Sequence, residues 1–300
     1  MYKLGQLLRK KYEGFLSDYY FPDLVQVRSS ASDRCIMSAQ VLAAGLFPPV
    51  QEQIWNPDLL WQPIPVNYLP KNRDNVIALR SECPKYAETL KQVYMSPRIK
   101  KINDENKNLY NYLSKVTGGN INDVNAVEYL YNTLVIEKRN NLTLPEWIND
   151  TLLHKLEEFA VLNYAIFSDN TLMKRLSGGG FLKEALSYVT AKINKTSNIN
   201  IVLYSGHDVT IVSITRSLGF ENEFSKPEYG AYIVLELYEN QDNEYEIEFL
   251  YGNNYESSPK KFEMKFCASP CTVMNFINGY DDVLPKDWEN ECAMHKPTFA

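Results

Sequence analysis

The stretch INIVLYSGHDVTIVSITRSL, residues 199–218, joins a nearly continuous apolar run to a segment with helical spacing. Such a run is typical of a buried parallel strand. The stretch LVQVRSSASDRCIMSAQVLAAGL, residues 24–46, repeats the pattern, with a short β-type run that ends at Arg28 and a strong helix after it. Strand–helix units near both ends of the chain therefore predict an α/β sheet domain.

The rest of the chain adds helices and one hairpin. The first sixteen residues have an apolar face at helical spacing but no capping side chain before it. In the helix after Arg28, Ser30 or Ser32 can form the cap. The segments 230–239 and 244–252 alternate as an antiparallel hairpin does. In the helix after Arg28 we expect Met37, Val41, Leu42 and Leu46 to point inward.

Residues 85–175 are more polar and read as mainly helical, with the clearest helix in PEWINDTLLHKLEEFAVLNYAIF, residues 145–167. We therefore predict an α/β domain formed by residues 1–84 and 176–300, with a helical subdomain inserted at 85–175.

Composition and charge exclude several classes of function. The 300 residues include 31 Lys and Arg against 37 Asp and Glu, a net charge of −6, which argues against a broad nucleic-acid interface. No apolar run reaches the roughly 18 residues of a membrane span. Three histidines leave few candidates for imidazole chemistry. Of these, we interpret His154 as a packing or surface residue within a helix and His295 as a solvated residue of the tail.

Two polar clusters follow apolar runs, where α/β sheets place their sites. Arg28 precedes a helix N-terminus, and a guanidinium there suits a phosphate; the alternative is a surface arginine. Gly206, His207 and Asp208 follow the late strand, where Gly206 permits a sharp turn. His207 can bind a phosphoryl oxygen and Asp208 can protonate a leaving group, or Asp208 is a helix cap beside a satisfied histidine.

Taken together, several motifs resemble the histidine acid phosphatases, above all the secreted prostatic and lysosomal type and its insect venom relatives. These motifs are VRSSASDRCIMSAQVLAAGLFPP (27–49), IWNPDLLWQPIPV (54–66), YSGHD (204–208), CASPC (267–271) and PKDWENEC (285–292). The resemblance implies a phosphoglycerate-mutase-like three-layer sandwich. It also implies phosphate monoester hydrolysis through a phosphohistidine, with no metal and no cofactor. In it, Arg28 corresponds to the phosphate-clamping arginine, His207 to a phosphate-binding histidine, Asp208 to the proton donor and Arg34 to a supporting arginine.

One family motif is absent, because none of the three histidines follows an arginine and no Arg-His-Gly occurs. In the family this motif supplies the nucleophile on the first central strand of the sheet. We therefore expect an N-terminally truncated, catalytically impaired form of an acid phosphatase, without that strand. The alternative is a non-catalytic secreted protein of the same fold that binds phosphate or a partner. A phosphoglycerate-mutase-like enzyme is a third option, which the His-Asp pair after the late strand disfavours.

The five cysteines are an odd number, so at least one lacks a partner within the chain. The resemblance implies the disulfides Cys83–Cys292 and Cys267–Cys271 and leaves Cys35, where a threonine is usual, as the free thiol. It also implies secretion or a lysosomal location and a possible homodimer. The sequons at Asn141, Asn149 and Asn194 point weakly in the same direction.

Overall fold

The computed structural model describes residues 1–78, 82–224, 226–256 and 258–294. Within them the strands form two sheets of three strands each. In the first, parallel sheet, β1 lies between β2 and β3. In the second, antiparallel sheet, β5 lies between β4 and β6, and β4 and β5 are the predicted hairpin. The strands are β1 Val25–Ser30, β2 Asn67–Leu69, β3 Ile201–Ser205, β4 Tyr232–Glu239, β5 Tyr245–Gly252 and β6 Lys260–Phe262.

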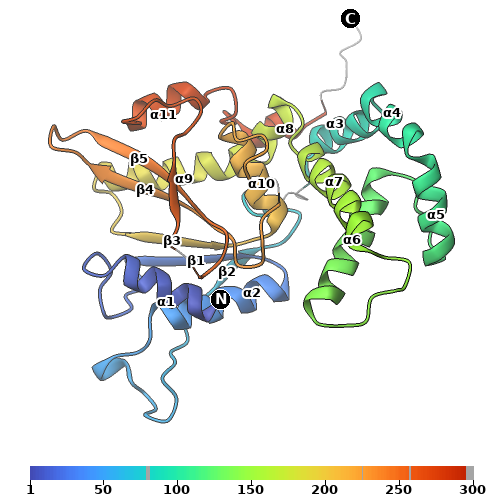
Figure 1. Ribbon diagram of the computed structural model, residues 1–300. Coiled ribbons are helices and arrows are strands. Elements are labelled where there is room, and N and C mark those ends of the chain that lie inside the picture. The colour runs from blue at the N-terminus through green and yellow to red at the C-terminus, as the bar shows by residue number, and fades with distance from the viewer. Residues whose placement is uncertain (79–81, 225, 257, 295–300) are drawn as a thin grey trace, which may run out of the picture.

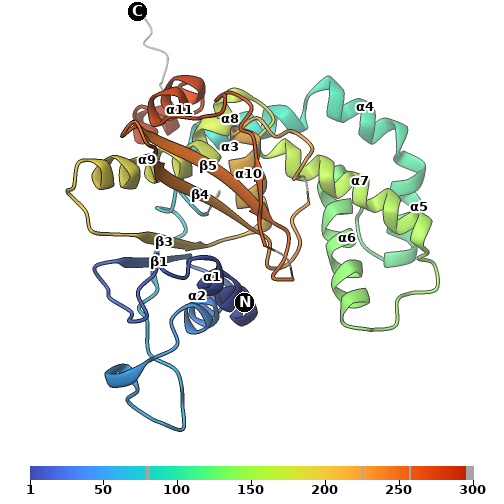
Figure 2. The ribbon, with the colours of Figure 1, turned by 60° about the vertical axis from the view of Figure 1, so that its left-hand side comes forward.

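Helices cover both faces of the parallel sheet, which gives the predicted α/β layers (Figure 1). Val25 and Val27 of β1 pack with α1 and α2, whereas Gln26 and Arg28 point to the other face and contact α9. This division follows from the alternation of side chains along a strand. Figure 2 shows the same layers from the side. The covering helices are α1 Tyr2–Lys11, α2 Asp33–Leu46, α9 Gly178–Ile193 and α10 Asp208–Ser217, and α11 Val273–Tyr280 and α12 Trp288–Cys292 follow the second sheet.

Strand β1 is longer than predicted. It continues past Arg28 to Ser30, because Ser29 and Ser30 pair with Tyr68 and Leu69 of β2. The expectation that the strand ends at Arg28 is therefore wrong. An apolar pattern cannot detect this extension, since the two serines owe their strand conformation to the neighbouring strand.

The inward face of α2 also differs from the prediction. Met37 is 62 % exposed and Val41 is 44 % exposed, so these two expectations are wrong, whereas Leu46 is fully buried. The helix packs on α1 through its small residues instead. A Cβ on Gly45 would lie 2.2 Å from the main-chain oxygen of Tyr2, so the helices approach too closely for larger side chains there.

The region between β2 and α9 is helical, as predicted, and has a core of its own (Figure 1, green helices). Its division from the rest at residues 84/85 and 175/176 stays a prediction. The helices are α3 Pro84–Tyr94, α4 Pro97–Glu105, α5 Lys107–Thr117, α6 Val124–Arg139, α7 Asp150–Ile166 and α8 Thr171–Leu176, and a short 3-10 helix, η1 Gln51–Gln53, precedes β2. We call α3–α8 the helical block.

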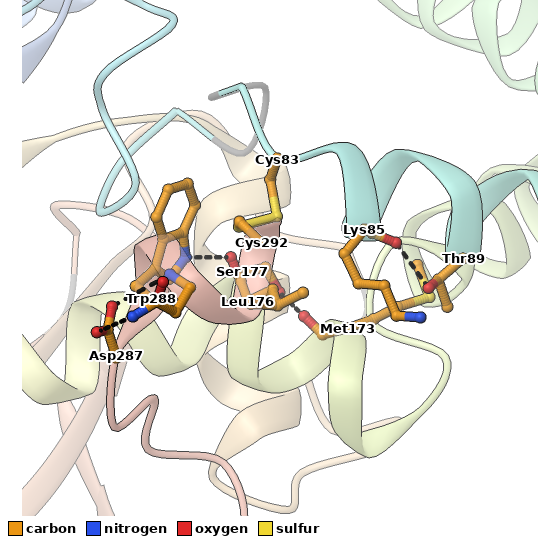
Figure 3. Close-up of a disulfide and its surroundings, with 10 residues drawn as sticks. Cys83, Lys85, Thr89, Met173, Leu176, Ser177, Asp287, Trp288 and Cys292 are labelled. Carbon is orange, nitrogen blue, oxygen red and sulfur yellow. Dashed lines mark hydrogen bonds between the residues drawn. A yellow bond between two sulfur atoms is a disulfide. The ribbon is translucent and has the colours of Figure 1, made fainter. Parts of the chain in front are cut away.

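Both disulfides implied by the resemblance are present, and Cys35 is a buried free cysteine. Cys83–Cys292 joins the residue before α3 to the end of α12 across 209 positions of sequence (Figure 3). Beside it, Nε1 of Trp288 donates a hydrogen bond to the carbonyl oxygen of Leu176 at 3.1 Å. The last helix is thus held to the start of the block and to α8.

Strands β3 and β4 each have one edge without a ladder partner in the described part of the chain. All residues of β3 are partly exposed, although its sequence is apolar. The absence of a central strand stays a prediction. No described helix is both long and apolar enough to cross a membrane.

Candidate functional site

His207 lies between the ends of β1 and β3, at the N-cap position of α10. Its Nε2 is 2.9 Å from Oγ of Ser30, and its Nδ1 is 3.2 Å from a guanidinium nitrogen of Arg34. Because a guanidinium only donates, Nδ1 is the acceptor in its contact with Arg34. In that tautomer Nε2 can donate to the hydroxyl oxygen of Ser30. We call Ser30, Arg34, His207 and Asp208 the His207 cluster.

The main chain around His207 is fixed by close packing. Cys35 Sγ is 3.2 Å from the carbonyl oxygen of Gly206 and 3.9 Å from both ring nitrogens of His207. A Cβ on Gly206 would lie 2.8 Å from Cγ2 of Ile77. Gly206 is not in the left-handed backbone region, so the sharp turn expected from it is not the reason for glycine. Lack of space beside Ile77 is the reason.

Asp208 is the first residue of α10, one position after the cap, so it is not the helix cap that the alternative interpretation required. Its Oδ1 accepts from the main-chain N–H of Val209 at 2.7 Å. Its Oδ2 accepts from the hydroxyl of Tyr164, in α7 of the helical block, at 2.8 Å. Both oxygens of this exposed carboxyl group thus face donors beside His207.

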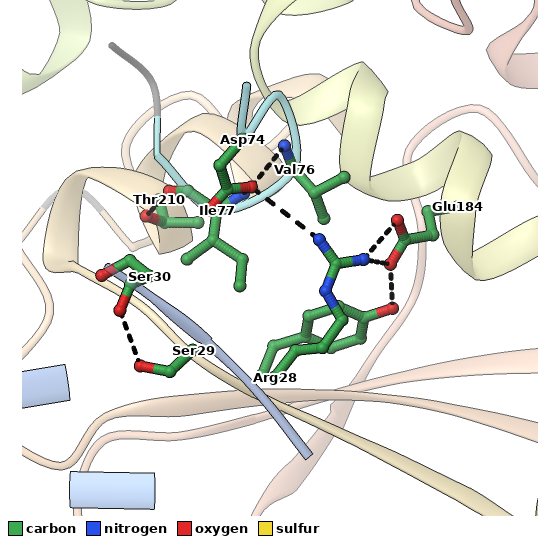
Figure 4. Close-up of polar contacts among 9 residues, drawn as sticks. Arg28, Ser29, Ser30, Asp74, Val76, Ile77, Glu184 and Thr210 are labelled. Carbon is green, nitrogen blue, oxygen red and sulfur yellow. Dashed lines mark hydrogen bonds and ion pairs between the residues drawn. The ribbon is translucent and has the colours of Figure 1, made fainter. Parts of the chain in front are cut away.

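Arg28 is neither at a strand end nor on the surface, because its side chain is only 11 % exposed and points beneath α9 (Figure 4). Its Nη1 bonds both carboxylate oxygens of Glu184, at 2.5 and 2.6 Å, and its Nη2 is 3.9 Å from Oδ1 of the buried Asp74. Tyr204 donates to Oε1 of Glu184 at 2.5 Å. We call Arg28, Asp74, Glu184 and Tyr204 the Arg28 cluster.

In the Arg28 cluster one cation faces two carboxylates. Burial alone lowers the pKa of Arg28, but the hydrogen bond and charge of Glu184 outweigh it, and the net pKa is raised. Burial first, and then the hydrogen bond to Glu184, raise the pKa of Tyr204 well above its usual range. Arg28 therefore stays charged and Tyr204 stays neutral at ordinary pH.

The structure thus brings together His207, Asp208 and Arg34 and places Arg28 in a separate cluster. Two neighbours were not predicted as site residues. Ser30 was considered only as a helix cap, and Tyr164 carries no sequence signal, because it lies 44 positions from Asp208.

The other candidates lie apart from this cluster. His154 is a surface residue, as one of its two interpretations held, with Nδ1 3.4 Å from Glu157. His295 lies outside the described residues. Among those described, no group of three or more side chains is arranged to hold a metal ion. The sequon residues Asn141, Asn149 and Asn194 are all exposed.

Comparison with known proteins agrees with this architecture. The chain is 33 % identical to prostatic acid phosphatase of Bos taurus over 305 residues, covering 99 % of this chain and 78 % of that protein. It is 30 % identical to lysosomal acid phosphatase of Rattus norvegicus over 301 residues, covering 99 % and 71 %. The crystal structure of a Klebsiella phytase has the same fold, with a TM-score of 0.65 at 13 % identity, covering 98 % of this chain and 87 % of that one.

A protein-family model matches residues 1–252, which include β1, β3 and the whole His207 cluster. The chain belongs to the histidine phosphatase superfamily (branch 2).

Proposed function

We propose that the His207 cluster binds the phosphoryl group of phosphate monoesters, as part of an acid phosphatase. The observation that carries this proposal is the contact between the guanidinium of Arg34 and the ring of His207. In the described ranges Arg34 forms no ion pair, so its charge is available to an anion. The N-termini of α2 and α10 lie beside it and add partial positive charge.

In this proposal Arg34, and not Arg28, holds the phosphate. Glu184 already occupies the guanidinium of Arg28 with two hydrogen bonds, and Asp74 lies on its other side. A phosphate at Arg28 would have to displace a carboxylate and would face a second one, which costs electrostatic energy. Among the described residues Arg34 contacts the imidazole of His207 and forms no ion pair, so an anionic oxygen can replace or join that contact.

The chemistry follows from the roles of these groups. In the full-length parent a nucleophilic histidine attacks phosphorus, the ester P–O bond breaks, and Asp208 gives its proton to the departing alkoxide oxygen. Water then attacks the phosphohistidine and releases phosphate. Arg34 and His207 stabilise the charge that develops on the phosphoryl oxygens. Because Asp208 must begin protonated, we expect an acidic optimum for the parent.

The 300-residue chain has no Arg-His-Gly motif, so in this proposal it binds phosphate but does not form the phosphoenzyme. A non-catalytic phosphate-binding role for the chain is the second candidate, and the same missing motif favours it. The two candidates differ in one expected result. A truncated phosphatase should hydrolyse phosphate monoesters once the nucleophilic histidine is restored, whereas a phosphate-binding protein should not.

Titration calorimetry with inorganic phosphate at pH 5, together with a p-nitrophenyl phosphate assay, tests the proposal. We expect measurable binding, a loss of binding in His207→Ala, and no turnover by the chain alone. His154→Ala is the matched control, since the His154 side chain is 79 % exposed and is not part of the His207 cluster. Wild-type chain that binds no phosphate contradicts the binding site, and clear turnover contradicts the missing nucleophile.

We further propose secretion or delivery to the lysosome, with glycans on the exposed Asn141, Asn149 and Asn194. The two disulfides support this, because disulfides persist in oxidising compartments. The relatives named lysosomal acid phosphatase support it as well. Expression through the secretory pathway and digestion with an endoglycosidase checks it. Unchanged mobility after digestion contradicts the glycans.

A homodimer is the third part of the proposal. The loop between η1 and β2 projects from the body of the protein (Figure 1), and exposes Trp55 by 59 % and Leu60 by 63 %. Exposed apolar side chains of this size are typical of association surfaces. Sedimentation velocity should show a dimer in the wild type and a monomer in Leu60→Glu. A monomeric wild type at tens of micromolar contradicts this part.

A further inference from the structure

Tyr164 is a side chain of the helical block that hydrogen-bonds the His207 cluster. It comes from α7, whereas Asp208 begins α10, and the two are 44 positions apart. Its ring is buried at 5 % exposure, while the Asp208 carboxyl that it reaches is exposed. A buried phenol thus holds one oxygen of an exposed carboxyl group, whose other oxygen accepts from the main-chain N–H of Val209.

Polar contacts continue from Tyr164 into the block. Asn132 of α6 hydrogen-bonds Tyr164, and Asn132 Nδ2 also donates to Oε1 of Glu128. Glu128 is a buried carboxyl residue at 7 % exposure. Tyr164 therefore donates to the exposed Asp208 on one side and is connected through Asn132 to the buried Glu128 on the other.

The protonation state of Tyr164 is fixed by its surroundings. Burial first, and then the charge of Asp208 and the hydrogen bond to it, raise the pKa of Tyr164 well above its usual range. The phenol is therefore a constant donor at every pH at which an acid phosphatase works. A constant donor favours the carboxylate over the carboxylic acid, because the carboxylate is the stronger acceptor.

We propose that Tyr164 is a positioning residue. By donating to Oδ2 it fixes the orientation of the Asp208 carboxyl beside His207, so that the helical block takes part in acid catalysis. This proposal rests on the proposed function, because positioning a proton donor matters only in an enzyme. Its test needs no enzymatic activity. Of the charged and titratable groups around Asp208, Tyr164 from α7 hydrogen-bonds it and His207 precedes it in the chain, while Arg34 from α2 is reached through His207 and Glu128 from α6 through Tyr164 and Asn132.

Two titrations of the 300-residue chain test the proposal. The first follows the ¹³C carboxyl resonance of Asp208, identified by its loss in Asp208→Asn, between pH 2.5 and 7. The second measures the affinity for sulfate over the part of this range above about pH 3.5, where sulfate is almost entirely the dianion. Ionised Asp208 repels the anion, so affinity should fall as Asp208 loses its proton.

In Tyr164→Phe we expect both midpoints to move to higher pH by about half a unit or more, because the carboxylate has lost a donor. Tyr110→Phe is the matched control, because Tyr110 is also a buried tyrosine of the block, and its hydroxyl bonds Asn103 instead. Its midpoints should equal those of the wild type. Near-ultraviolet circular dichroism confirms that each variant is folded.

The outcomes separate the two proposals. A folded Tyr164→Phe protein whose Asp208 resonance titrates as in the wild type overturns the role of Tyr164. An equal shift in Tyr110→Phe overturns it too, because the effect would then come from the block in general. If the wild type binds neither sulfate nor phosphate, the proposed function fails, and the carboxyl resonance alone still decides the role of Tyr164.

Discussion

Arg28 and Ser30 point from the same face of β1, two residues apart, into clusters of opposite electrostatic character. In the Arg28 cluster one guanidinium meets the carboxylates of Glu184 and Asp74, so positive charge is matched inside the protein. In the His207 cluster the guanidinium of Arg34 contacts the imidazole of His207 and, among the described residues, forms no ion pair. Under the proposed function, the arginine with its own carboxylates supports the fold and the other binds the phosphoryl group.

The largest expected effect is on stability. Arg28→Ala leaves Glu184 and the fully buried Asp74 without their cation, so the free energy of unfolding should fall by about 3 kcal/mol or more. Urea unfolding measures it. The folded fraction should bind phosphate as the wild type does. Unchanged stability with lost phosphate binding would reverse the roles of the two clusters.

The second effect is on binding. Arg34→Ala should weaken phosphate binding at pH 5 by about 10- to 100-fold, the value of one charged hydrogen bond. Its unfolding free energy should change by less than about 1 kcal/mol, because no described carboxylate loses a partner. Titration calorimetry measures the phosphate affinity of Arg34→Ala and Arg28→Ala under the same conditions. Equal affinities in the two variants would contradict the proposal that Arg34, and not Arg28, binds phosphate.

The third effect appears in alkali. Burial and the hydrogen bond to Glu184 raise the pKa of Tyr204 in the folded state, so the native protein keeps this proton longer than the unfolded chain. The stability from this group is complete below about pH 10 and is lost as pH rises toward the native pKa. Tyr204→Phe should therefore be about 1 kcal/mol less stable at pH 7 but lose stability less steeply above pH 10.

Urea midpoints from pH 7 to 11 measure the slope for Tyr204→Phe. Tyr229→Phe is its control, because Tyr229 is 70 % exposed. If the stability of Tyr204→Phe falls with pH as steeply as that of the wild type, the Arg28 cluster does not raise the pKa of Tyr204 in the folded state.

The smallest effect concerns Ser30, which accepts from Nε2–H of His207. Ser30→Ala should cost about 1 kcal/mol of stability and reduce phosphate affinity by no more than about threefold, since Arg34 still holds the ring. Ser29→Ala is the neighbouring control, because the Ser29 hydroxyl bonds only the main-chain oxygen of Ser30. A loss of affinity as large as that of Arg34→Ala would place Ser30 among the ligands of phosphate.

Much of the fold could be predicted from local patterns. The α/β class, the hairpin and the helical character of residues 85–175 follow from apolar periodicity, and the resemblance supplied both disulfides. The two errors in α2, Met37 and Val41, arose because glycine and alanine let two helices approach closely, which favours small residues over large ones. A pattern that counts only large apolar residues selects the wrong face.

The site was predicted less completely, for a physical reason. His207 and Asp208 could be identified because they directly follow a strand. The difference between Arg28 and Arg34 depends on Glu184 and Asp74, which reach Arg28 from distant parts of the chain. Tyr164 likewise meets Asp208 only through the packing of α7 on α10. Contacts of this kind become visible only when the chain is folded.

The Cys83–Cys292 disulfide also decides how the molecule carries a mechanical load. If the two ends of the chain are pulled apart, tension runs from residue 83 to residue 292 through one covalent bond and bypasses the chain between them, a sequence separation of 209. The helical block, β3 to β6 and α10 lie inside that bypass. Only the segment with α1, β1, α2 and β2 is stretched, so Arg34 should leave His207 before any part of the bypassed segment unfolds.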